Sequence, residues 1–308
     1  MALQELFVGY EDDIKKLFER IVAESGLSAP PATRIELTDT DNGMLFRSIP
    51  SERCVKAEWR GVASLWAMSQ AVGRLAPIIF ETRRNGSPRV EIRDGSPQEL
   101  GLNFIGYAKE LCVRQKWRWN SYFPKPDRTA NSDEKRYCEQ FFWKSLEWIL
   151  RHEVAHIALG HQDSPWSADE SRSQEREADL YASRGQKGDD LSDAERPAGA
   201  HPDESELALE RNAVALGIGL VWVALYENAG GPPSEMYPPV ADRLYRSLEE
   251  FGLQKDSMTS EILSDFIKAW VDPQSAWPDP SSADATAQRA LDEACGRLDD
   301  YMRGRNQT

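Results

Sequence analysis

The stretch "ILRHEVAHIALGHQ", which runs from Ile149 to Gln162, decides how the fold is interpreted. It holds three of the four histidines of the chain, and it continues the apolar pattern of residues 141–148. Apolar residues cover most of the circumference of a helix drawn through this region, so we expect a central, buried helix. Gly160 stands where such a helix is expected to end.

Within this stretch, His152-Glu153-Val154-Ala155-His156 is an HExxH sequence. Two histidines four residues apart lie one turn apart on one face of a helix, so both rings can reach a single zinc ion. The glutamate beside the first histidine points at the metal-bound water and can take its proton as a general base. The motif therefore predicts His152 and His156 as metal ligands and Glu153 as the catalytic base.

A catalytic zinc ion needs a third protein ligand and an open fourth position. His161 is one candidate, but the known pattern HExxHxxGxxH requires glycine at position 159 and histidine at position 162, where this chain has Leu159 and Gln162. We therefore expect His161 to lie beyond the end of the helix rather than on the metal.

The segment "QEREADLYA" offers a second candidate. Glu175, Asp179 and two alanines share one helix face, and the small alanines let this helix approach the HExxH helix closely. Glu175 could then reach the metal, and Asp179 could accept the ring N–H of a metal-bound histidine. Glu177 points elsewhere. The alternative is a solvated charged helix, which has no reason to gather its acids on the alanine face.

The two segments together, "HEVAHIALGH" and "SRSQEREADLYA", resemble the glutamate-ligand zinc metallopeptidases, or gluzincins, over residues 149–183. The resemblance implies a zincin-like helical core, one zinc ion, Glu175 as the third ligand and Asp179 as the partner of a ligand histidine. The length of the chain, its central motif and the segment "MYPPVADRLYRSL" are also similar to the Lit-type phage-exclusion peptidases. Those are cytoplasmic bacterial proteases that cleave a translation elongation factor. Related metallopeptidases often have His-Pro where this chain has Tyr237-Pro238.

Peptide hydrolysis also needs a hydrogen-bond donor for the oxyanion that forms beside the metal. The sequence offers four candidates for this role, each of which could instead be a structural or surface residue: Tyr237, Arg243, His201 and His161.

Composition narrows the class of protein. The chain has 308 residues, 40% of them hydrophobic and 29% charged, which is typical of a soluble globular protein. The net charge of −14 argues against a broad nucleic-acid interface. The basic, aromatic stretch at 113–128 could stack bases or could be a loop anchored by its aromatic rings. The longest apolar run, at 213–226, is shorter than the ~20 residues that span a bilayer, so we expect a core helix and no membrane.

The four cysteines show no paired spacing, and the N-terminus lacks a signal-peptide pattern, so the cytoplasm is the expected location. The fold class is predicted as mainly α (α+β), with a small strand-rich patch before residue 95. A division into residues 1–130, 131–253 and 254–308 is predicted, or one continuous domain. We expect the following elements: helices at 11–26, 56–75, 96–115, 132–161, 173–185, 206–226, 240–253 and 258–271 and at the C-terminus, a hairpin at 34–49, a strand at 88–94, and a loop at 186–205 that gates the site.

The function predicted from these features is a zinc endopeptidase that cleaves a protein substrate, in bacterial defence or stress response. An active cytosolic protease needs control, which a regulatory partner protein could supply. The alternative is a catalytically silent zinc-containing interaction or regulatory module. Structural zinc sites are usually closed by four protein ligands, whereas three well-placed ligands are visible here, and this difference favours catalysis.

Overall fold

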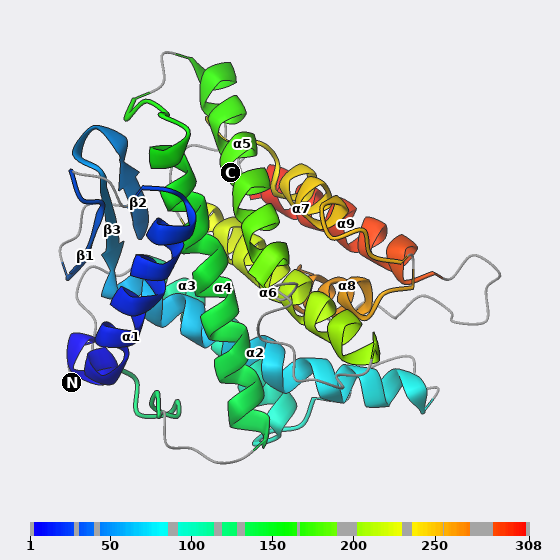
Figure 1. The fold of residues 1–308 in the computed structure, drawn as a ribbon. Helices are drawn as coiled ribbons and strands as arrows, with labels where there is room; N and C mark the ends of the chain where they lie inside the picture. The colour runs from blue at the N-terminus through cyan, green and yellow to red at the C-terminus, as the bar shows by residue number, and fades with distance from the viewer. Residues whose placement is uncertain are drawn as a thin grey trace.

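A computed structural model describes residues 3–27, 31–39, 44–85, 92–113, 119–127, 133–164, 167–189, 202–229, 236–254, 256–271 and 286–305. The predicted class, mainly helical with a small N-terminal sheet, is confirmed (Figure 1). The elements in chain order are α1 (Leu3–Glu24), β1 (Arg34–Thr38), β2 (Phe46–Ile49), η1 (Pro50–Glu52), β3 (Cys54–Glu58), α2 (Trp59–Arg84), α3 (Pro97–Val113), α4 (Asp133–Ala158), α5 (Ala168–Asp189), α6 (Pro202–Asn228), α7 (Val240–Glu249), α8 (Met258–Val271) and α9 (Ala287–Arg305).

The sheet corrects one prediction. The hairpin expected at 34–49 does not form, because β3 lies between β1 and β2 in the order β1-β3-β2. β1 pairs with β3 in parallel, and β2 pairs with β3 antiparallel. β3 also takes Lys56 to Glu58, which the sequence had assigned to the start of the following helix. The local turn signal was misleading because the partner of β1 comes later in the chain.

α4 is the central helix, as predicted. It packs against α1, α2, α5, α6 and β2. Phe142, Leu146, Leu150 and Val154 are fully buried along it, so its apolar side chains contact protein on several sides. The helix ends in a Schellman arrangement. Gly160 adopts φ +68°, and the N–H groups of residues 160 and 161 return to carbonyls of the last turn.

α5 is longer than predicted, because it continues through Gly185 to Asp189. A Cβ atom at Gly185 would lie 2.9 Å from the guanidinium of Arg151, so this glycine permits close packing against α4 rather than ending the helix. The predicted loop at 186–205 is therefore shorter at both ends. Its remaining residues, 190–201, lie outside the described residues, as does most of the strand predicted at 88–94.

Two helical segments are long and apolar enough to cross a bilayer, namely Trp59–Ile79 in α2 and Glu206–Asn228 in α6. Their apolar windows are 78% and 72% buried inside the protein, which is how core helices of a globular protein behave. The apolar run at 213–226 lies in the core, as expected. The expectation rested on the short length of the run, but the helix that contains it is long enough to span a bilayer, so the evidence for the core is its burial.

The basic, aromatic stretch at 113–128 also uses its rings for packing. Trp119 and Phe123 are buried, and the Trp119 indole N–H donates to the carbonyl of Phe123. Tyr107 stacks on Phe123 with ring centroids 4.2 Å apart. Trp119 is thus unavailable for base stacking, which corrects that alternative. Residues 114–118 lie outside the described residues.

Candidate metal centre

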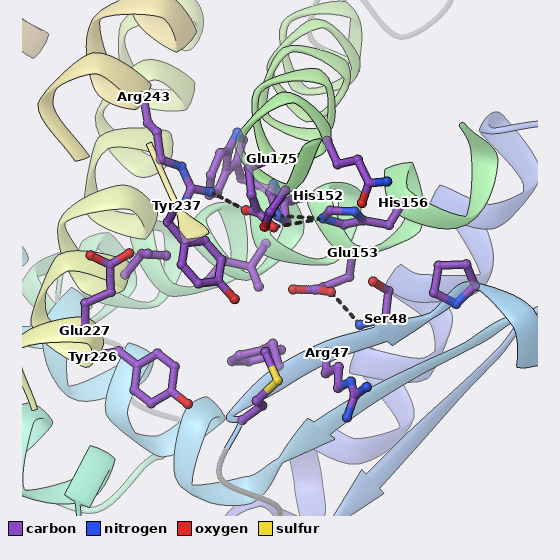
Figure 2. A pocket seen from close by; sticks show the side chains of 18 of the residues that line it. Arg47, Ser48, His152, Glu153, His156, Glu175, Tyr226, Glu227, Tyr237 and Arg243 are labelled. Atoms are coloured by element: carbon purple, nitrogen blue, oxygen red, sulfur yellow. Dashed lines mark hydrogen bonds and ion pairs between the residues drawn. The ribbon is translucent and has the colours of Figure 1, made fainter. Parts of the chain in front are cut away.

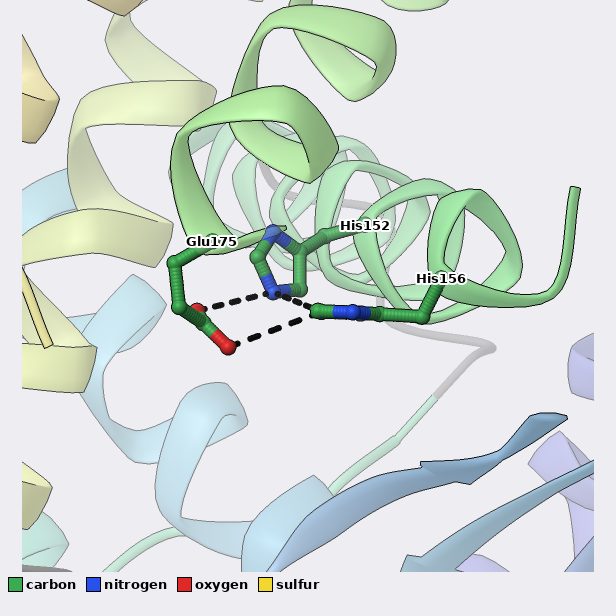
Figure 3. Close-up of side chains that lie close together, drawn as sticks. All are labelled: His152, His156 and Glu175. Atoms are coloured by element: carbon green, nitrogen blue, oxygen red, sulfur yellow. Dashed lines mark hydrogen bonds and ion pairs between the residues drawn. The ribbon is translucent and has the colours of Figure 1, made fainter. Parts of the chain in front are cut away.

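The predicted ligands meet where α5 crosses α4. Ala178 and Ala182 on α5 have no exposed surface, so small side chains bring the two helices together as the sequence predicted. Glu175 on the same α5 face then reaches the two histidines of α4 (Figure 3).

The three ligand atoms have the spacing of a zinc site. The Nε2 atoms of His152 and His156 are 3.2 Å apart. The carboxylate oxygens of Glu175 lie 3.3 Å from His152 Nε2 and 3.6 Å from His156 Nε2. A tetrahedral zinc ion with ligand bonds of ~2.0–2.1 Å separates its ligand atoms by about 3.3 Å, so this donor set fits zinc. Within the described residues, these three side chains are the one group identified with metal-site spacing.

Each of the two histidines also has a neighbour at its Nδ1 atom, on the side of the ring opposite the ligand nitrogen Nε2. Asp179 Oδ1 lies 3.0 Å from His152 Nδ1, which is the contact predicted for this residue. His161 Nδ1 lies 2.8 Å from His156 Nδ1, and Glu177 lies 3.4 Å from the other His161 nitrogen. His161 therefore orients His156 and does not face the metal position, which corrects its assignment as an oxyanion donor.

Arg243 on α7 also contacts the residues around the ligands. It donates to both Asp179 oxygens at 2.8 Å, and it lies 3.3 Å from Glu175. Burial alone would raise the pKa of Glu175, but His152 and Arg243 together lower it to about 2. Burial and the neighbouring His152 lower the pKa of His156 to about 3.

Glu153 lies on the cavity side of α4, next to the edge strand β2 (Figure 2). Its Oε2 atom accepts a hydrogen bond from the backbone N–H of Ser48 at 2.6 Å. Burial raises the pKa of the Glu153 carboxyl, as is common for a group kept for proton transfer. Ser48 was not predictable from the sequence, because the contact joins residues 105 positions apart.

A cavity of about 210 Å³ opens in front of the ligands. Tyr237 and Arg243 line it, whereas His201 lies outside the described residues. Burial raises the pKa of Tyr237, so its hydroxyl keeps its proton. Sequence reasoning also missed Glu227, a cavity residue that stands at the end of an apolar helix with no motif around it. The wall includes Phe46, Trp148, Ile149, Trp222, Val223 and Tyr226.

Comparison with known proteins bears on this site. The model of a family described as peptidase U49 matches residues 55–263, which is more than half of the chain and includes all three ligand candidates. A protein of Escherichia coli (strain K12) described as "Cell death peptidase" is 24% identical over 177 residues, covering 56% of this chain and 54% of that protein. The chain thus spans about half the length of the curated relative it matches. No solved structure matches the chain significantly.

Proposed function

We propose that this chain, which belongs to the peptidase U49 family, is a zinc-dependent endopeptidase that hydrolyses a protein substrate. The observation that carries the proposal is the spacing of His152, His156 and Glu175, whose ligand atoms lie 3.2 to 3.6 Å apart beside an acidic residue. Family membership supports a peptidase. The donor set supports zinc.

Three side chains would bind the ion, and three others would orient them. His152, His156 and Glu175 supply two nitrogens and one carboxylate, which is the ligand set of glutamate-ligand zinc peptidases. Asp179, His161 and Arg243 hold those ligands from the far side. Zinc bound there supplies Lewis-acid chemistry, which activates water and polarises the scissile carbonyl.

Glu153 moves the proton in this scheme. Its Oε2 atom is held by the N–H of Ser48, so Oε1 is the oxygen that accepts a proton from the attacking water. The same carboxyl then delivers that proton to the nitrogen of the leaving amine. The hydrogen bond from Ser48 keeps the carboxylate turned toward the cavity and away from the ligands.

Tyr237 is the favoured oxyanion donor among the four candidates from the sequence. It lines the cavity, and Figure 2 shows its hydroxyl directed into the space between Glu175 and the sheet. Arg243 is less suited to this role, because its guanidinium already pairs with Asp179 and Glu175. We assign the donation to the Tyr237 hydroxyl.

The rival function is a zinc-containing module without turnover. It requires a closed site, and closed structural sites have four protein ligands. Within the described residues, three ligands converge, and the remaining side faces the cavity. That open side favours catalysis.

The proposal also includes a cytoplasmic setting, a role in bacterial defence or stress response, and control by a partner protein. The buried free thiols of all four cysteines fit a reducing compartment.

Elemental analysis joined to a cleavage assay tests the proposal. Wild type, Glu153→Gln and Glu175→Ala are purified without chelators, and bound metal is measured together with release of new N-termini from a bacterial protein extract. We expect one zinc ion in wild type, the same zinc content without cleavage in Glu153→Gln, and loss of both in Glu175→Ala. Cleavage that survives Glu153→Gln unchanged, or wild type that binds no metal, would refute the proposal.

A further inference from the structure

Among the described residues, the cavity contains one buried carboxylate oxygen without a hydrogen-bond partner. Glu227, near the end of α6, lines the same cavity as the metal ligands. Its Oε1 atom is shielded from solvent and has no hydrogen-bond partner within the described residues. Burial raises the pKa of this carboxyl to about 7, which reflects the cost of an unpaired charge at this position.

Two arginines line the cavity, and Arg243 attracts the Glu227 carboxyl without forming an ion pair with it. Arg243 forms ion pairs with Asp179 and Glu175. Arg47 is exposed on β2, across the cavity from Glu227 (Figure 2). Neither arginine forms an ion pair with Glu227. A carboxylate in such a place is stabilised when a cation pairs with it, so the cavity is arranged to receive a positive charge from outside the chain.

The walls beside Glu227 suit a side chain that is apolar along its length and charged at its tip. Trp222 and Tyr226 stack with ring centroids 6.0 Å apart, and Phe46 meets Trp222 edge-on at 5.6 Å. Lysine and arginine bury their aliphatic stems along apolar surface while their charged ends find polar partners. Aromatic faces also attract cations directly.

We infer that Glu227 is a specificity residue, which binds the charged end of a lysine or arginine side chain in a peptide substrate. The inference rests on the proposed function, because the metal ligands and Glu227 line one cavity. Because Glu153 and the metal ligands line the same cavity as Glu227, the basic residue would lie near the cleaved bond.

Binding of paired peptides tests this inference without turnover. Each pair is N-acetylated, C-amidated and fluorescent, and differs only by lysine or methionine at one position. The zinc-loaded Glu153→Gln protein is titrated with both peptides, and anisotropy gives the two dissociation constants. A charge-assisted hydrogen bond predicts at least about tenfold tighter binding of the lysine peptide at one position. In a double variant that carries Glu153→Gln and Glu227→Gln, the ratio of the two dissociation constants should fall to about one.

Glu206→Gln is the matched control, because it makes the same charge change on an exposed part of the same helix and should keep the ratio. Equal binding of the two peptides, or a preference that survives Glu227→Gln, overturns the inference. A third peptide carries methionine at that position and a free N-terminus. If it binds more tightly than its N-acetylated form, and Glu227→Gln removes this difference, the side-chain assignment is overturned in favour of a terminal amine.

Wild-type cleavage separates this inference from the proposed function. Cleavage with no lysine or arginine preference refutes the specificity of Glu227 and leaves the peptidase standing. Lysine-dependent binding through Glu227, with no cleavage by wild type, supports the cation site and refutes the peptidase.

Discussion

Arg243 and Asp179 form a buried, bidentate ion pair, in which the guanidinium donates to both carboxylate oxygens at 2.8 Å. The pair joins α7 to α5, and Asp179 also lies 3.0 Å from His152 Nδ1. One arginine thus orients the ligand His152 through Asp179 and contacts the ligand Glu175 at 3.3 Å. The geometry of the candidate metal centre therefore depends on where α7 docks.

Replacing Arg243 with methionine should destabilise the fold. The change leaves Asp179 buried without its partner, and breaking a buried ion pair from one side typically costs about 3–5 kcal/mol. Urea unfolding of wild type and Arg243→Met measures the loss. Arg246→Met is the control on the same helix. Its pair with Asp242 is solvent-exposed, so its loss should lower the unfolding midpoint far less. Similar losses in the two variants would contradict a structural role for the buried pair.

Replacing Ser48 with proline should impair catalysis and spare zinc binding. The Ser48 N–H points out of the sheet at Glu153, so proline removes this hydrogen bond without removing a bond between strands. We expect a loss of about ten- to a hundredfold in kcat, because the base is displaced rather than removed, and a positioned base contributes about 10²–10⁴-fold. Zinc content and kcat are measured together.

Ser48→Ala is the matched control, since it keeps the N–H and removes only the hydroxyl, which also acts on Glu153. A fall in kcat for proline well beyond that for alanine isolates the backbone donor. If both variants lose zinc, the contact is structural and the interpretation is wrong.

The convergence of His152, His156 and Glu175 was predictable from sequence because each position is fixed by helical spacing. The i, i+4 histidines and the alanine-lined face of Glu175 follow from local periodicity. Other parts depend on contacts between distant residues. The β1-β3-β2 order replaces a hairpin whose turn signal was local. The hydrogen bond from Ser48 to Glu153 and the end of α5 beyond Gly185 likewise depend on packing between elements.

The contact between His161 and His156 was only partly predictable, because it depends on the turn that ends α4 as well as on helical spacing. Gly160 at the end of α4 predicted the turn, and the left-handed conformation of that glycine brings the next residue back onto the helix. A histidine placed directly after such a glycine was a usable signal for a contact with His156. The known three-histidine pattern carries no such signal, because it places the third histidine on the metal.

Replacing His161 with alanine should weaken zinc binding by about ten- to a hundredfold, because partners behind a ligand histidine fix its ring and tautomer. Competition with a chromophoric chelator measures the dissociation constant. Leu159→Ala, an exposed change two residues away, serves as the control and should leave the constant unchanged. Equal affinity in wild type and His161→Ala would mean that His156 is oriented by the helix alone.

Glu227→Gln should stabilise the protein above neutral pH. The pKa of Glu227 is raised to about 7 from 4.5, so the folded state holds this proton more tightly than the unfolded state. Its stabilising effect is complete below about pH 4.5 and is lost as the pH rises through about 7. Each unit of pKa difference corresponds to about 1.4 kcal/mol, so wild type loses roughly 1–3 kcal/mol across this window.

Glutamine carries no such proton, so Glu227→Gln should match wild type near pH 5 and exceed it by that amount near pH 8. Urea unfolding of both proteins at pH 5, 6, 7 and 8 measures the difference, with Glu206→Gln as the exposed control that should show none. If the free energy of unfolding of Glu227→Gln does not rise above that of wild type with increasing pH, Glu227 is already well solvated or paired. A growing advantage would mean that an ionised carboxylate is kept in the cavity at a cost to stability, as expected where a substrate cation supplies its partner.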